Sequence, residues 1–179
     1  MSRLTQKVIQ RTKGDDALLK KLFAELEVSV PAALHEDLDD LVTAIQDLPA
    51  GLRAMAATYQ LDVSMALDDL GWHFANWHHH RYCRETRWGL QELEATEVAE
   101  IYDRAYSITS QQWDVITQLL ERGSDAFTDW YGTSELEATL APLNRKLWEI
   151  LKETSPGGEG GVFRFWLAYA RKYPERVVW

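Results

Sequence analysis

Residues 96–105 read Thr-Glu-Val-Ala-Glu-Ile-Tyr-Asp-Arg-Ala, and this stretch decides the fold class. Its apolar side chains recur at the i, i+3, i+4 and i+7 spacing of one helix face: Val98, Ile101, Tyr102 and Ala105. Two carboxylates, Glu97 and Glu100, fall in the first turn, where their negative charges interact favourably with the positive end of the helix dipole. The stretch therefore predicts an amphipathic α-helix.

The same spacing continues on both sides of this helix. It recurs in six further ranges: 18–26, 34–48, 52–70, 113–120, 143–151 and 162–169. No segment of useful length alternates with a period of two, so no sheet is expected. The pattern predicts an all-α, compact, single-domain bundle of about six to eight helices over residues 1–179. A less tightly packed N-terminal helical appendage is the alternative for residues 1–30.

Proline, glycine and capping residues suggest where the helices begin and end. We expect one helix over residues 31–48, with Pro31 in its first turn and Leu34 on its inner face. Gly71 is expected to interrupt the chain, and Thr109 with Gln112 is expected to form a capping box. Pro142 is expected near the start of a later helix.

The single cysteine predicts a reducing compartment. Cys83 is the single cysteine of the 179 residues, so no internal disulfide can form. The first residues lack the apolar run of a signal peptide, and no stretch reaches the roughly 20 apolar residues of a membrane span. We therefore expect a cytoplasmic protein that does not enter a membrane.

Charge is concentrated in two acidic blocks. Residues 25–69 hold ten acidic side chains against Arg53 alone, and the whole chain has a formal net charge of -9. A second block, residues 92–103, holds five acidic side chains and no basic one. Such a field repels phosphate backbones and attracts basic protein surfaces, so no direct nucleic-acid binding is expected. The candidate partner-binding residues are Glu36, Asp37, Asp39, Asp40, Asp47, Glu97, Glu100 and Asp103. The alternative is that these acidic faces only keep the domain soluble.

A histidine-rich segment is the strongest candidate for chemistry. Imidazole and thiolate groups are the ligands that zinc prefers, and the segment offers five of them: His73, His78, His79, His80 and Cys83. The spacing does not match the His-Glu-x-x-His motif of zinc enzymes, and three consecutive histidines must splay around any regular element. The arginines that flank Cys83 would lower the pKa of its thiol if they lay close to it. We expect no metal, no cofactor and a structural cysteine, with metal binding as the alternative.

Three segments together resemble a known bacterial helical family. Residues 68–76 (DDLGWHFAN) resemble its Asn-Asn-Gly-Gly-Phe-x-Gln-Phe motif, and residues 89–101 resemble its Leu-x-x-Ile-Gly-Ala-x-x-x-Ala-x-Ile/Leu stretch. Residues 169–175 are similar to its closing Tyr-x-x-x-Asn-Pro-Glu. Four features depart from the family pattern: the Asp68-Asp69 pair, Leu70, Glu94 and Tyr173.

The family is the DNA-mimic-protein-like one, and the resemblance covers roughly residues 60–179. It implies an all-helical fold. It also implies a role like that of the family's namesake, an acidic helical protein that occupies the DNA-binding face of a transcription factor.

The function predicted from these observations is that of a non-enzymatic interaction protein whose acidic face binds a basic or DNA-binding protein. The alternative is a metal-binding protein or metal-dependent enzyme that uses the histidine-rich segment. The sequence leaves open whether the chain also forms a homo-oligomer.

Overall fold

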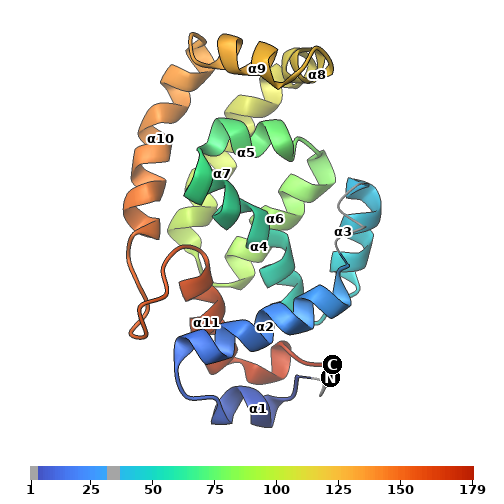
Figure 1. The fold of residues 1–179 in the computed structure, drawn as a ribbon, viewed down its shortest axis with the longest axis vertical. Helices are drawn as coiled ribbons and strands as arrows, with labels where there is room; N and C mark the ends of the chain where they lie inside the picture. The colour runs from blue at the N-terminus through green and yellow to red at the C-terminus, as the bar shows by residue number, and fades with distance from the viewer. Residues whose placement is uncertain (1–3, 32–36) are drawn as a thin grey trace.

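The structure is a computed structural model that describes residues 4–31 and 37–179. These residues form eleven α-helices and two short 3-10 helices, with no strand among them (Figure 1). The all-α prediction is confirmed, but the prediction of six to eight helices is too low. The α-helices are α1 (Gln6–Arg11), α2 (Asp15–Ser29), α3 (Leu38–Gln46), α4 (Ala50–Leu67), α5 (Leu70–Asn76), α6 (His80–Glu92), α7 (Thr96–Thr109), α8 (Trp113–Glu121), α9 (Ser124–Tyr131), α10 (Glu135–Leu151) and α11 (Phe163–Lys172). The 3-10 helices are η2 (Ser110–Gln112) and η3 (Pro174–Arg176).

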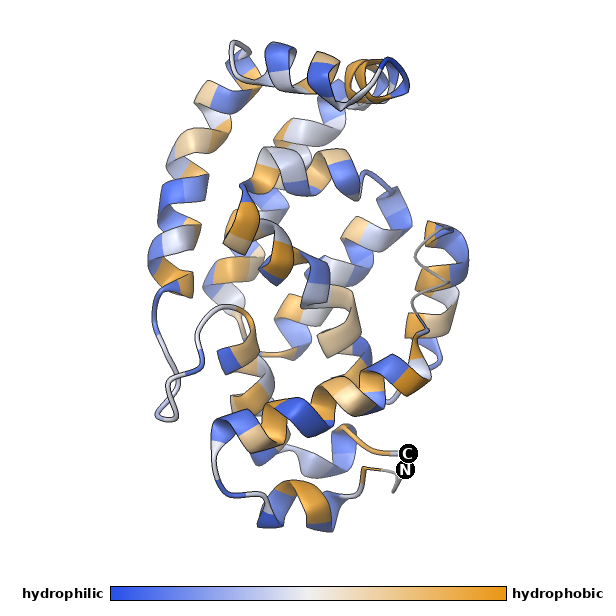
Figure 2. Ribbon diagram, in the orientation of Figure 1, coloured by the Kyte–Doolittle hydropathy of each residue, from blue (hydrophilic) through white to orange (hydrophobic). Residues whose placement is uncertain are grey.

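Helix α4 is the central element of the bundle. It packs against α2, α3, α5, α6, α11 and η3, and Leu52, Met55 and Leu61 on it are fully buried. The crossing with α6 is close because α6 carries a glycine there: a Cβ on Gly89 would lie 2.9 Å from the carbonyl oxygen of Ala54. Figure 2 shows hydrophobic and hydrophilic residues alternating along the outer helices α2 and α10, as expected of helices with one buried face.

A polar network fixes α5 against α9 and α10. Asp69 caps α5 by accepting a hydrogen bond from the Trp72 amide, and its other oxygen accepts hydrogen bonds from the Tyr131 hydroxyl and the Asn144 side-chain amide. The Asn144 side-chain oxygen in turn accepts a hydrogen bond from the Leu70 amide. Gly71 lies inside α5, directly beneath the Tyr131 ring. The expected interruption at Gly71 is therefore wrong: the chain breaks at the Asp68-Asp69 pair instead.

Several other expected boundaries are also wrong, and the helix count is low because none of the expected ranges corresponds to α1, α5, α6 or α9. Thr109 ends α7 and makes no capping hydrogen bond, because the chain continues through η2 directly into α8. Helix α9 was not predicted. Helix α10 begins at Glu135, capped by the Ser134 hydroxyl, so Pro142 lies in its interior.

The expected helix over residues 31–48 is shorter than predicted. Asp37 is extended, and its carboxylate accepts hydrogen bonds from the amides of Asp39 and Asp40, so α3 begins at Leu38. Leu34 and Glu36 lie outside the described residues. The inner face of α3 is as predicted, because Leu41 and Ile45 are buried.

The N-terminal helices α1 and α2 pack against the C-terminal helix α11. Leu18 and Leu22 of α2 are fully buried, and Phe23 makes edge contacts with Tyr59 and Phe163. The glycine-rich loop over residues 155–161 is anchored to α2 by Asp15. The Asp15 carboxylate accepts hydrogen bonds from the Ser155 hydroxyl and the Gly157 amide and forms an ion pair with Arg171.

Candidate functional site

The histidine-rich segment does not assemble into a ligand set. In the part of the chain that the structure describes, no group of three or more His, Cys, Asp or Glu side chains is placed to hold a metal ion. The five candidate ligands are divided among the inside of α5, the turn after it and the first turn of α6: His73, His78, His79, His80 and Cys83.

His73 belongs to the core. It is completely buried, and its ring nitrogens contact the Ser64 hydroxyl at 3.0 Å and the Tyr102 hydroxyl at 3.4 Å. Burial lowers the pKa of His73 from 6.5 to about 3, so the imidazole is neutral at physiological pH. Its two hydroxyl partners satisfy both nitrogens and leave neither for a metal.

The other candidate ligands have separate structural partners. His78 contacts the Ala75 carbonyl at 2.8 Å, and His80 contacts the Tyr106 hydroxyl at 2.8 Å. His79 caps α6 through the Tyr82 amide. Burial raises the pKa of the Cys83 thiol to about 12, so this thiol is a poor nucleophile and a structural residue.

The acidic residues of α3 are only partly available to a partner. Asp37 caps the helix, and Asp39 forms an ion pair with Arg81 and contacts the His79 ring. The hydrogen bond from Arg81 is the main reason that the pKa of Asp39 is lowered. Asp40 and Asp47 are exposed and form no ion pair with a described residue.

The acidic residues of α7 are likewise divided. Glu97 forms an ion pair with Lys146, and Asp103 forms one with Arg87. Glu100 is exposed and has no ion-pair partner among the described residues. Of the seven predicted binding residues that the structure describes, three are therefore exposed carboxylates that neither form an ion pair nor cap a helix: Asp40, Asp47 and Glu100.

A further acidic segment was missed in the sequence. Residues 110–141 carry six acidic side chains and a single basic one, Arg122. These carboxylates lie on α8, α9 and the first turn of α10, at the top of the molecule in Figure 1. We call them the acidic cap, and its members are Asp114, Glu121, Asp125, Asp129, Glu135 and Glu137. None forms an ion pair with a described residue, and all but Glu137 are exposed. They are spread along the chain without a dense run, so a search for charge blocks did not find them.

Two members of the acidic cap lie at helix positions where the helix dipole disfavours a negative charge. Glu121 is the last residue of α8, and Asp129 is in the last turn of α9. A carboxylate near a helix C-terminus faces the negative end of the helix dipole and lowers the stability of the helix. The fold supplies no compensating cation for either side chain within the described residues.

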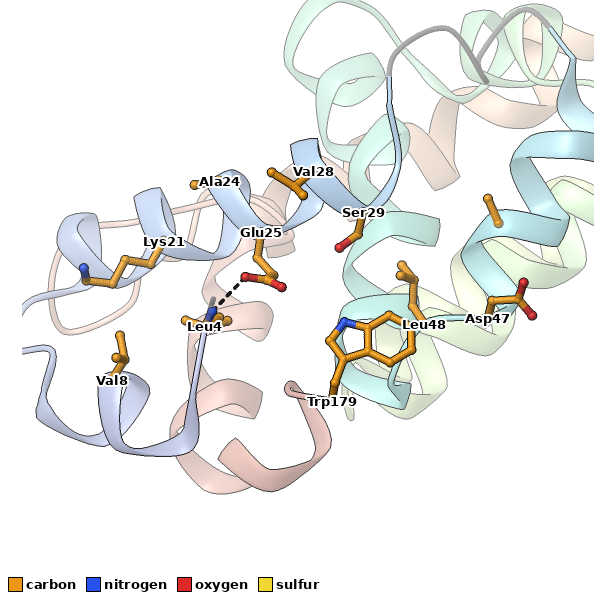
Figure 3. Close-up of a pocket in the computed structure, with 11 residues that line it drawn as sticks. Leu4, Val8, Lys21, Ala24, Glu25, Val28, Ser29, Asp47, Leu48 and Trp179 are labelled. Atoms are coloured by element: carbon orange, nitrogen blue, oxygen red, sulfur yellow. Dashed lines mark hydrogen bonds between the residues drawn. The ribbon is translucent and has the colours of Figure 1, made fainter. Parts of the chain in front are cut away.

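A groove of about 930 Å³ lies between α2, the end of α3 and Trp179 (Figure 3). Its wall is largely apolar and includes Val28, Leu48 and Trp179, with Lys21 and Asp47 at opposite ends in the view of Figure 3. Glu25 also lines it, and its carboxylate accepts a hydrogen bond from the Leu4 amide at 2.9 Å.

Comparison with known proteins identifies a family. None of the described helices is both long enough and apolar enough to cross a membrane. No curated protein and no solved structure matches the chain significantly. A family model described as DMP19-like protein matches residues 46–172, which includes α4 to α11 and the whole acidic cap. Because this match covers more than half of the chain, the chain belongs to the DMP19-like protein family.

Proposed function

We propose that this chain is a non-enzymatic interaction protein whose acidic cap binds a basic, DNA-binding protein. The family supports this function, since the resemblance implies an acidic helical protein that takes the place of DNA. The acidic cap lies inside the matched region, whereas four of the predicted acidic residues (Glu36, Asp37, Asp39 and Asp40) precede it.

The observation that carries the proposal is the position of Glu121 and Asp129. Each lies near the C-terminus of its own helix, where the helix dipole is expected to lower the stability, and neither caps a helix or pairs with a cation of the described chain. Residues that reduce stability without a structural role are typical of binding sites. Asp40 on α3, Asp47 at its end and Glu100 on α7 are further unpaired carboxylates outside the acidic cap.

Charge neutralisation tests the proposal. The cap variant carries Glu121→Gln and Asp129→Asn, and its matched control carries Glu97→Gln and Asp103→Asn. Both variants remove two negative charges, but the control removes carboxylates that Lys146 and Arg87 already neutralise. The native chain, immobilised through a tag, first captures basic proteins from a lysate of the source organism. The affinity of each variant for the captured protein is then measured by calorimetry at two salt concentrations.

We expect the cap variant to lose about fivefold in affinity, from about 0.5 kcal/mol for each exposed charge. Its binding should also depend less steeply on salt than that of the native chain. The control should change by less than twofold. Equal losses in the two variants would show that only net charge matters, and the absence of any captured basic protein would refute the function itself.

A further inference from the structure

Unpaired positive charges gather at the end of the molecule opposite the acidic cap. Residues 4–21, which include α1 and the first half of α2, carry five basic and two acidic side chains. Both acids already have partners. Asp15 forms an ion pair with Arg171, and Asp16 forms one with Lys20. Four exposed cations remain without an ion-pair partner among the described residues, and we call them the basic end: Lys7, Arg11, Lys13 and Lys21.

The acidic cap and the basic end lie far enough apart to act separately. The longest axis of the molecule is vertical in Figure 1, with α8 and α9 at the top and α1 at the bottom. Helix α10 begins in the acidic cap and runs downward for 17 residues, about 25 Å, and it still ends above α1. Salt screens charges over about 10 Å at 0.1 M ionic strength, so each end presents its own sign of charge to an approaching molecule.

Each end of the molecule offers the charge that the other end lacks. The acidic cap has six carboxylates and one cation, Arg122, and none of these seven groups forms an ion pair with a described residue. The basic end has four cations, and η3, which packs against α1, adds one exposed carboxylate, Glu175. A second copy of the chain can therefore place a surface of opposite charge against either end.

We infer that the chain associates with itself head to tail, with the basic end of one copy docked on the acidic cap of the next. Because the two contacting surfaces differ, each pair of copies keeps one free cap and one free basic end, and the contact can extend to further copies. A docked copy covers the cap, so self-association competes with a foreign basic protein for the same carboxylates. The inference does not require the proposed function, since the occupant is the chain itself.

The effect of salt separates this contact from an apolar one. Two chains that each have a net charge of -9 repel each other, and added salt screens that repulsion. Association through apolar surfaces therefore becomes stronger as salt is added. Association through complementary ends becomes weaker, because salt also screens the exposed charges that attract each other.

Sedimentation equilibrium of the full chain, at concentrations up to about 1 mM, measures the association at about 0.1 M and at about 1 M salt. The end variant carries Lys7→Gln and Lys13→Gln. Its matched control carries Arg84→Gln and Arg104→Gln, which remove two exposed cations of α6 and α7 that also lack an ion-pair partner among the described residues. The cap variant and its control are those of the charge-neutralisation experiment.

We expect the native chain to exceed the monomer mass at the lower salt concentration and to return towards it at the higher one. The end variant and the cap variant should each associate about fivefold more weakly, and both controls should change by less than twofold. In an equimolar mixture, the native basic end of the cap variant meets the native acidic cap of the end variant. The mixture should therefore recover the native affinity, with one copy of each variant in the main complex.

Three results would overturn the inference: a chain that stays monomeric, an association that grows with salt, or a mixture that associates no more tightly than either variant alone. None of them touches the proposed function, which depends on how the cap variant binds the captured protein. Conversely, a cap variant that loses self-association but keeps full affinity for the captured protein would support the head-to-tail contact and refute the acidic cap as the site for a foreign partner.

Discussion

Substituting Gly71 with alanine should destabilise the fold strongly, because the space above this glycine is filled by Tyr131. A Cβ added at Gly71 would lie 2.1 Å from Cζ and 2.2 Å from the hydroxyl oxygen of Tyr131. The ring cannot move away easily, since it stacks on Phe127 with centroids 5.4 Å apart and donates a hydrogen bond to Asp69. The clash must therefore displace α5 from α9.

The cost follows from two contributions. Forcing a methyl group into a closely packed contact costs about 2 kcal/mol. Stretching the hydrogen bond from Tyr131 to the Asp69 carboxylate adds about 1 kcal/mol. We therefore expect Gly71→Ala to lower the free energy of unfolding by about 3 kcal/mol, measured by urea denaturation with circular dichroism at 222 nm.

Gly132→Ala is the matched control from the same region. Gly132 has φ -61°, and the nearest atom to an added Cβ is 3.5 Å away, so alanine fits there. This control should be neutral or more stable by about 0.5 kcal/mol. In a Tyr131→Ala background the clash disappears, and Gly71→Ala should then cost little. A loss below about 0.5 kcal/mol for Gly71→Ala alone, or a strictly additive double variant, would refute the packing argument.

Two further predictions concern the titratable side chains of His73 and Asp15. The pKa of His73 is lowered to about 3 by burial, so the stability that its neutral form contributes is present above pH 6.5 and is lost as the pH falls below that value. Between pH 6.5 and 4.5 we expect the free energy of unfolding to fall by about 1.4 kcal/mol per pH unit. The His73→Leu variant should lose this pH dependence, whereas the control His80→Gln should keep it. Equal slopes in the native chain and in His73→Leu would contradict the prediction. The pKa of Asp15 is lowered by its hydrogen bonds from Ser155 and Arg171, so its contribution is present above about pH 3.8 and is lost as the pH falls through the lowered value. Asp15→Asn should lower the free energy of unfolding by about 2 kcal/mol at pH 7 and by clearly less at pH 3. A loss of stability that does not change with pH would rule out an ionised Asp15 as the anchor of the glycine-rich loop.

The fold class was predictable because the helical spacing is a local signal. The stripe containing Val98, Ile101 and Tyr102 needed no tertiary information, and all three residues are buried as expected. Predicting where each helix begins and ends needed tertiary information as well. Pro142 is tolerated inside α10, and Thr109 leaves its hydroxyl without a hydrogen-bond partner because η2 carries the chain into α8.

The candidate sites were less predictable, because each depends on which side chain a residue meets in space. The sequence shows that Asp39 and Glu97 are acidic, but their partners, Arg81 and Lys146, are 42 and 49 positions away. In the same way, Asp69 belongs to the acidic block of residues 25–69, yet its carboxylate holds Tyr131 and Asn144 together. Long-range pairing of this kind leaves no trace in one sequence.

The two roles that an acidic surface can have favour different positions for its carboxylates. If acidic residues only keep a domain soluble, any exposed position serves, and stability favours helix N-termini such as those that carry Asp125 and Glu135. Glu121 and Asp129 occupy the opposite ends, so neutralising them should raise the free energy of unfolding by a few tenths of a kcal/mol each. Solubility alone then gives no reason to keep them in place of glutamine and asparagine, which are also polar. A cap variant that is more stable than the native chain and binds its partner more weakly would mark these two carboxylates as maintained for binding.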